Sequence, residues 1–260
     1  MPYVIGERVH IPASKLGLGE DHPFSMVSTT IRDITDRSVK VDLRDGQVSQ
    51  DIPLSVVRKK LGVLIIEIGD YKTEETLLTP LKKSILQFTR LLLSDDCIRH
   101  YTIRTPCEFG YVWREQHAVT SHLILIGHGD AGSLLFGENT AVDSAQLLQL
   151  MQTPHGVGEA KQVISLCCKT GSKTFGGAVS GHPNVESFIG PVSAVHGATA
   201  SQFCQSYLTY LFLQGFRSST AYEYAKAANP GTSDFVLWRK TRPFAHKSGV
   251  LRITRDQTSV

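Results

Sequence analysis

Two stretches of this sequence decide its fold, LILIGHGDAGSLLFG (residues 123–137) and VISLCCKTG (residues 163–171). Each opens with an apolar run, as in a buried strand, and then turns through small residues that carry a chemically reactive group. The first run ends at His128, between two glycines, and the second ends at the adjacent Cys167 and Cys168. The pattern predicts two buried strands that each present a reactive side chain where the strand ends.

From residue 61 onward, strand and helix patterns alternate. LGVLIIEIG (61–69) is a continuous apolar run, typical of a strand buried on both faces, and helical patterns begin near Thr79 and Asp143. This alternation predicts right-handed β–α–β crossovers, and therefore a three-layer α/β fold with a mainly parallel sheet. Functional sites of such sheets lie beyond the carboxyl ends of the strands, which is where His128 and Cys168 fall.

Residues 1–60 have a different pattern. Short β-type runs are separated by turn clusters, and SVKVDLRDGQVSQDIP (38–53) alternates apolar and polar residues around the Asp45-Gly46 turn. This pattern is typical of a β-hairpin. We therefore predict a small β-rich accessory domain over 1–60, of the SH3-like barrel type, followed by the main domain over 61–260.

The composition narrows the class of protein. The 260-residue chain is 41% hydrophobic and 20% charged, and its net charge of +3 is too small to indicate a nucleic-acid partner. No signal-peptide pattern opens the sequence, and the apolar stretch 207–213 is too short to span a membrane. Five irregularly spaced cysteines favour reduced thiols in a cytoplasmic protein. Adjacent cysteines suit zinc poorly, so we expect neither a metal nor a cofactor.

A thiol and an imidazole at two strand ends are the groups that nucleophilic acyl transfer requires. The thiolate is the attacking form of a cysteine, and a neighbouring imidazolium favours it. Glycines beside these groups leave backbone N–H groups accessible to a substrate. The residues therefore predict a cysteine peptidase.

The two motifs resemble the caspase-like clan of cysteine peptidases, and the resemblance extends over roughly residues 61–240. The histidine segment is similar to that of caspases, in which a strand, a His-Gly turn, an acidic residue and a hairpin with Phe-Gly follow one another. VISLCCKTG resembles the nucleophile segment, and the separation of 40 residues (168 minus 128) is comparable with about 50 in caspases. CHAT and legumain forms place Ser/Thr-Gly two and three residues after the nucleophile, and metacaspases use the second cysteine of a pair. The resemblance thus selects Cys168, with Cys167 turned inward.

This resemblance implies a cysteine endopeptidase with a Cys-His dyad. Cys168 would attack the scissile carbonyl and His128 would protonate the leaving amine, while the backbone N–H groups of Gly129 and Cys168 bind the oxyanion. Asp130 would hold the loop. The family also implies a regulated effector of the microbial defence or cell-death type, acting on a protein or peptide and activated by a partner or a small-molecule signal. The glycine-rich stretch 171–184 would then be a mobile activation loop.

The acidic residue that forms part of the substrate-binding site in some relatives is missing here. The sequence therefore leaves open which residue precedes the cleaved bond. Leu166 stands where metacaspases and legumain-like relatives carry an acidic residue. The charged residues that could line a specificity pocket are Glu67 for a basic side chain and Lys72, Arg104 and Lys169 for an acidic one.

Several alternatives accompany this interpretation. A catalytically inactive caspase-like scaffold or ligand-binding module is the second candidate, and a serine hydrolase is a weaker third because no GxSxG elbow is present. Cys167 is the alternative nucleophile and His196 the alternative base. We expect His155 and His182 to be solvated, and the remaining cysteines to be packing residues, namely Cys97, Cys107 and Cys204.

Overall fold

The computed structural model describes residues 3–18, 22–43, 46–59, 61–138, 140–152, 160–232 and 234–244. Its centre is a seven-stranded sheet of order β14-β13-β12-β11-β7-β5-β6. The five neighbouring strands β12, β11, β7, β5 and β6 are parallel to one another. The remaining two are antiparallel: β13 pairs with β12, and β14 pairs with β13. In chain order the strands are β5 (Val63–Ile68), β6 (Ile98–Ile103), β7 (His122–Ile126), β11 (Lys161–Ser165), β12 (Val185–Pro191), β13 (Phe235–Arg239) and β14 (Arg242–Pro243). The predicted mainly parallel sheet is confirmed.

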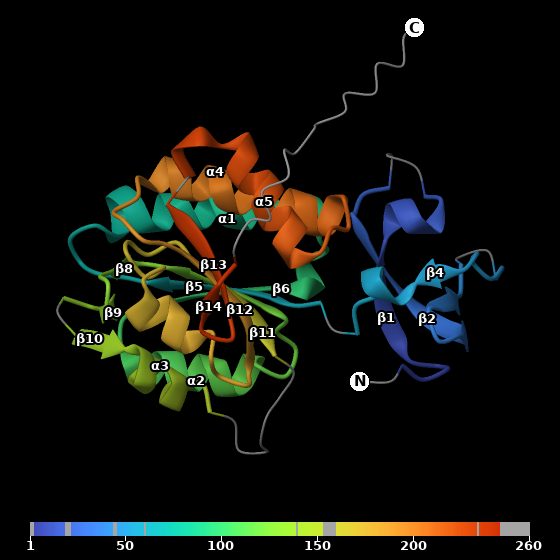
Figure 1. Cartoon of the computed structure of the whole chain (residues 1–260), viewed down its shortest axis with the longest axis horizontal. Helices are drawn as coiled ribbons and strands as arrows, with labels where there is room; N and C mark the ends of the chain where they lie inside the picture. Colours follow the sequence, from blue (N-terminus) through green and yellow to red (C-terminus); the bar gives the residue numbers. More distant parts are fainter. Residues whose placement is uncertain are drawn as a thin grey trace, which may run out of the picture.

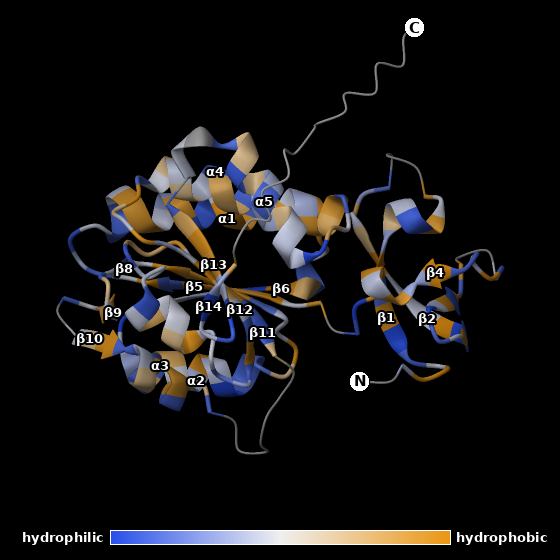
Figure 2. Ribbon diagram, viewed as in Figure 1, coloured by the Kyte–Doolittle hydropathy of each residue, from blue (hydrophilic) through white to orange (hydrophobic). Residues whose placement is uncertain are grey.

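Helices cover both faces of this sheet, as Figure 1 shows. One face carries α1 (Thr79–Leu92), α4 (Gly197–Leu208) and α5 (Ser218–Ala228), and the other carries α2 (Pro106–Gln116) and α3 (Ser144–Leu150). Each layer buries its own apolar cluster against the sheet, so apolar side chains concentrate between the helices and the strands (Figure 2). The predicted three-layer architecture is therefore confirmed.

Local sequence signals explain where these elements begin. All six residues of β5 are buried, which accounts for its continuous apolar run. Capping boxes open α2, between Thr105 and Glu108, and α3, between Asp143 and Gln146. In each box the two residues satisfy backbone N–H groups that have no partner within the helix. The helix expected near Asp143 thus begins where its cap predicts.

The stretch 171–184 differs from the predicted mobile loop. It contains a π-helical turn, Lys173–Gly177, and Phe175 and Val179 are fully buried. A Cβ atom at Gly171 would lie 2.1 Å from the carbonyl oxygen of Gly190, and one at Gly176 would lie 2.8 Å from the Phe188 ring. The glycines are there because the backbone packs closely on β12, so the expectation of an activation loop at this position is wrong.

The N-terminal sheet is formed by β1 (Arg8–Pro12), β2 (Met26–Ile34), β3 (Ser38–Val41) and β4 (Ile52–Pro53), all antiparallel and in that order. It has an apolar cluster of its own. The backbone of Arg58 pairs with that of His10 in β1, so the end of this segment returns to its first strand. The β3–β4 hairpin is as predicted, although Asp45 of its turn lies outside the described residues. The SH3-like barrel and the boundary at 60 remain predictions.

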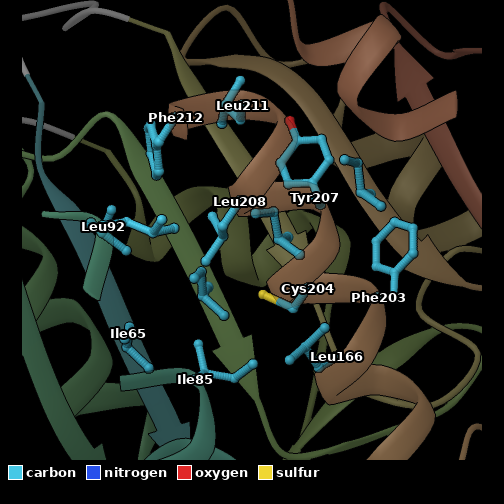
Figure 3. Packing of buried hydrophobic residues seen from close by; sticks show 14 of the residues in the cluster. Ile65, Ile85, Leu92, Leu166, Phe203, Cys204, Tyr207, Leu208, Leu211 and Phe212 are labelled. Atoms are coloured by element: carbon cyan, nitrogen blue, oxygen red, sulfur yellow. The ribbon is translucent and has the colours of Figure 1, made fainter. Parts of the chain in front are cut away.

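The cysteines outside the motif divide into two kinds. Cys97 and Cys204 are buried, as expected, and Figure 3 shows Cys204 packed beside Leu166 and Leu208. Cys107 is exposed instead, because it lies on the outer side of the first turn of α2. Its expected packing role is therefore wrong.

Candidate active site

His128 and Cys168 lie at the same edge of the sheet. They follow the neighbouring parallel strands β7 and β11, in which Leu125 is paired with Ser165. His128 opens the short strand β8 (His128–Gly129), which joins β9 (Ser133–Phe136) and β10 (Thr140–Asp143) in a small sheet beyond the edge (Figure 1). The parallel topology thus brings the two predicted groups together although 40 residues separate them.

The two segments contact each other directly. A Cβ atom at Gly129 would lie 3.1 Å from the carbonyl oxygen of Cys168 and 3.2 Å from the Cβ of Cys167. Glycine is therefore required at this position, because a side chain would force the histidine strand away from the cysteine turn. This close approach sets the distance between the two halves of the site.

A carboxylate that sequence reasoning did not identify orients the histidine ring. Nε2 of His128 lies 2.8 Å from Oδ2 of Asp70 and 2.6 Å from Oγ1 of Thr73. The Thr73 hydroxyl also donates to Oδ2 of Asp70, at 2.7 Å. The Nε2–H group thus points at the carboxylate, which leaves Nδ1 as the ring nitrogen available to a thiol or a substrate.

Asp70 is itself fixed by the loop that follows β5. Its Oδ1 accepts hydrogen bonds from the backbone N–H groups of Lys72 and Thr73, at 2.6 and 2.7 Å. Burial opposes the charged form, but these bonds, the Thr73 hydroxyl and the nearby His128 outweigh it and hold the pKa of Asp70 below its ordinary value. Asp70 is therefore a carboxylate at neutral pH. It is the first acidic residue after β5, which is the signal that could have identified it.

The two adjacent cysteines occupy opposite environments. Cys167 is fully buried in the apolar cluster beneath α2, and burial raises the pKa of its thiol to about 12. Cys168 is only partly buried, and its Sγ lies 3.5 Å from the backbone nitrogen of Val195, which donates to it. Of the pair, Cys168 is the accessible thiol, and Cys167 is a core residue.

The turn that carries Cys168 is held on both sides. The backbone N–H groups of Lys169 and Gly171 donate to Ser193 and Pro191, at 3.0 and 2.7 Å. Inside the turn, Oγ1 of Thr170 lies 2.8 Å from the carbonyl oxygen of Cys167. Lys169 has a left-handed backbone with φ of 60°, which is costly for a residue with a side chain. Such strain persists because these bonds fix the turn.

Backbone N–H groups are available beside the thiol. Among the described residues, none accepts a hydrogen bond from the N–H of Cys168. In the β8–β9 ladder the N–H of Asp130 donates to Ser133, so alternation makes His128 and Leu135 the next hydrogen-bonded pair. The N–H of Gly129 is then directed away from β9. Both groups therefore remain free to donate to a ligand.

The other sequence candidates take structural roles. Oδ1 of Asp130 accepts from the N–H groups of Gly132 and Ser133, both at 2.7 Å, which is the loop-holding contact expected for it. His196 caps α4 by accepting from Ala198, and His182 accepts from Asn184. His155 lies outside the described residues.

Two of the charged residues considered for a substrate-specificity pocket, Glu67 and Arg104, already have partners within the protein. Glu67 is fully buried within β5, where Lys82 pairs with it at 2.6 Å. Arg104 pairs with Glu74 at 2.7 Å and lies over the Tyr71 ring. Lys72 and Lys169 flank Asp70 and Cys168 in sequence. The side chains of Glu67 and Arg104 are thus already used within the protein.

Over the ranges that the structure describes, no three His, Cys, Asp or Glu side chains are placed to hold a metal ion. Within the same ranges, no helix has the length and apolar character needed to cross a membrane.

Comparison with known proteins identifies the fold. No protein-family model and no curated protein matches this chain by sequence. A solved structure that is similar is that of a secreted C11 cysteine protease from Bacteroides thetaiotaomicron, in complex with an irreversible peptide inhibitor. The two share 9% identity with a TM-score of 0.51, over 70% of this chain and 67% of the other. At this identity the likeness shows the fold alone, which is similar to that of this C11 cysteine protease.

Proposed function

We propose that this protein is a cysteine endopeptidase in which Cys168 is the nucleophile, His128 the general acid and Asp70 the residue that positions the histidine. The observation that carries the proposal is the pairing of an oriented His128 with the accessible Cys168 at one edge of a caspase-like sheet. A buried Cys167 beside it leaves a single thiol suited to the chemistry.

The proposed reaction has two stages. The Cys168 thiolate attacks the scissile carbonyl, and the N–H groups of Gly129 and Cys168 stabilise the oxyanion, each donor contributing about 3 kcal/mol to the transition state. His128 then gives a proton from Nδ1 to the leaving amine, and a thioester remains on Cys168. Water attacks the thioester as His128 takes its proton, which regenerates the thiol. Asp70 stabilises the imidazolium throughout.

The proposed biological setting is that of a regulated effector of the defence or cell-death type, located in the cytoplasm and acting on a protein or peptide. The separate N-terminal sheet supports a docking or sensing role for residues 1–60. The segment before α4 supports control of the thiol, since the N–H of Val195 donates directly to Sγ of Cys168. A change in this segment would alter access to the nucleophile.

The test uses four proteins beside the wild type: Cys168→Ala, Cys167→Ala, His128→Ala and Cys107→Ala. Each is incubated with a mixed fluorogenic peptide library and, separately, with an irreversible peptide electrophile followed by mass spectrometry. We expect cleavage and labelling to be lost in Cys168→Ala, and cleavage to be lost in His128→Ala. Cys107→Ala is the control for an exposed cysteine and keeps both.

Two results would contradict the proposal. Cleavage that survives Cys168→Ala but disappears in Cys167→Ala would move the nucleophile to the buried cysteine. A wild type that cleaves no peptide and whose Cys168 reacts no faster with the electrophile than Cys107 would favour the inactive scaffold. Labelling does not depend on the choice of substrate, so it separates a missing activator from a missing active site.

A further inference from the structure

The opposite edge of the main sheet holds a second polar cavity, of about 500 Å³. It lies where β7, β11 and β12 begin, and the antiparallel β13 brings its last residue, Arg239, to the same place. Arg217, which precedes α5, and Arg58, which is paired with β1 of the N-terminal sheet, line it as well. Figure 1 shows the N-terminal sheet on the side away from β8, so this cavity is remote from His128.

The charges around the cavity do not balance. Within the described ranges, none of the three arginines forms an ion pair. Glu186 is the single carboxylate among the lining residues, so three positive charges face one negative charge. Nη1 of Arg58 donates to the carbonyl oxygens of Ser55 and Val57, at 2.9 and 3.2 Å, so part of its fork is already used. Positive charges without a carboxylate partner, gathered around one concave space, favour an anionic occupant that the remaining N–H donors can bind.

His122 supports the same conclusion independently. Its side chain is 3% exposed, lines the cavity, and has a buried Nε2 without a hydrogen-bond partner, while Nδ1 lies 2.8 Å from Oγ of Ser121. The neighbouring amide of Gln162 is engaged by Tyr207 and Glu186. Nε of Arg239 is also buried and without a partner. Buried polar groups left unsatisfied cost about 1–3 kcal/mol each, so two of them at one cavity indicate a ligand that completes them.

The electrostatics of His122 report the field in this region. Burial first, and then the charge of Arg58, lower its pKa to about 3, and Lys161 adds to this, while the neighbouring Gln162 side chain acts in the opposite direction as a hydrogen-bonding group. The imidazole is therefore neutral, and a ligand meets it as a hydrogen-bonding group rather than as a cation.

We propose that this cavity binds a small molecule with two or more phosphate groups, held by Arg58, Arg217 and Arg239. The volume lies within the range of small-molecule sites, and an excess of two positive charges suits a polyphosphate better than a single carboxylate. The first N–H groups of α5, at Ser218 and Ser219, add donors of the kind that phosphate oxygens accept. Because Arg58 belongs to the N-terminal sheet, the ligand would bridge that sheet to the main one.

The test measures binding of three probes to the full chain by calorimetry: inorganic phosphate, tripolyphosphate and ATP. Variants are Arg217→Gln, Arg239→Gln and the conservative Arg239→Lys, and the matched control is Arg114→Gln, an exposed arginine on α2 that lines a different cavity. We expect one equivalent of tripolyphosphate or ATP to bind, with about tenfold weaker affinity in each Gln variant, since one charge-assisted hydrogen bond is worth at least 1.4 kcal/mol. Arg239→Lys recovers part of the loss, and Arg114→Gln binds as the wild type does.

Each further outcome has one meaning. Tighter binding of ATP than of tripolyphosphate supports a nucleotide, and equal binding supports recognition of the phosphates alone. No binding of either at millimolar concentration overturns the proposal, as does an equal loss in Arg114→Gln, which would show non-specific attraction. Circular dichroism of each variant shows that it is folded. Peptidase activity plays no part in the measurement, so the proposed function can fail without affecting it.

Discussion

The polar groups at the two edges of the main sheet differ in whether they have hydrogen-bond partners within the protein. The carboxyl edge is the one where the parallel strands end, and the amino edge is the one where they begin. At the carboxyl edge His128, Asp70 and Thr73 are partners of one another, and the N–H of Val195 donates to the Cys168 thiol. At the amino edge Nε2 of His122 and Nε of Arg239 are buried without hydrogen-bond partners in residues that line a cavity. In the proposed peptidase, catalytic groups are oriented before the substrate arrives, and the hydrogen bonds within the first edge agree with that role. A binding site can leave its donors for the ligand to complete.

The largest effect that we expect lies within the carboxyl edge, between its two cysteines. A thiol with a pKa of about 12 carries at least 10³-fold less thiolate at neutral pH than one titrating near 8.5. Cys167 should therefore react with iodoacetamide more than about 10³-fold slower than a free cysteine, and far slower than Cys168, which is only partly buried. Peptide mapping of the labelled protein at pH 7.5 measures both rates in one sample.

The exposed Cys107 serves as the internal reference for that measurement, and the buried Cys204, whose pKa burial also raises to about 12, serves as the negative one. Cys167 should follow Cys204. Labelling of Cys167 at a rate like that of Cys107 would mean that the carboxyl edge opens to solvent. The hydrogen bonds at this edge would then not keep its groups fixed in solution, which would contradict the comparison of the two edges.

The next effect tests whether Asp70 acts through His128. We expect Asp70→Asn to lower kcat/KM by about 100-fold or more, because an amide cannot stabilise the imidazolium that forms during proton transfer. Asp130→Asn is the matched control: it removes a carboxylate at the same edge, keeps an oxygen that accepts from Gly132, and should retain its rate. Equal rates for both variants would contradict a positioning role.

The pH dependence of stability gives Asp70 a second readout. Its pKa is lower in the folded protein, so the folded state binds fewer protons than the unfolded one as pH falls below about 4. The stabilisation is present above that pH and is lost as pH falls through the folded pKa. Asp70→Asn should therefore flatten the acid side of the profile in urea unfolding experiments, even in the absence of a substrate.

Sequence patterns predicted the parts of this molecule that depend on local order. The apolar runs gave β5, β7 and β11, the caps gave the start of α3, and the strand ends placed His128 and Cys168 at one edge. Each of these follows from residues a few positions apart, or from the rule that parallel strands end at the same edge.

Features that depend on distant contacts were beyond the sequence. Asp70 reaches His128 across 58 positions (128 minus 70), and its place after the apolar run is the single local feature that separates it from Glu67, which lies within β5. The glycines of 171–184 indicated a loop, whereas they are present because β12 lies against their backbone. The sequence shows that Glu67 lies inside the strand and Asp70 in the loop after it only when the end of β5, at Ile68, is known.

The smallest effect, and the one of opposite sign, is at the amino edge. His122→Leu removes a buried imidazole whose Nε2 lacks a partner, and Ser121 keeps its hydrogen bonds to Gly62. Replacing an unsatisfied polar group by an apolar one of similar size should raise the unfolding free energy by about 1 kcal/mol in urea titrations without a ligand. If His122 belongs to a site that a ligand completes, tripolyphosphate should stabilise the wild type more than this variant. The difference in unfolding free energy between the two proteins should then become smaller or change sign. A variant that is less stable than the wild type without any ligand would mean that the protein satisfies His122 internally, and the two edges would then be built alike.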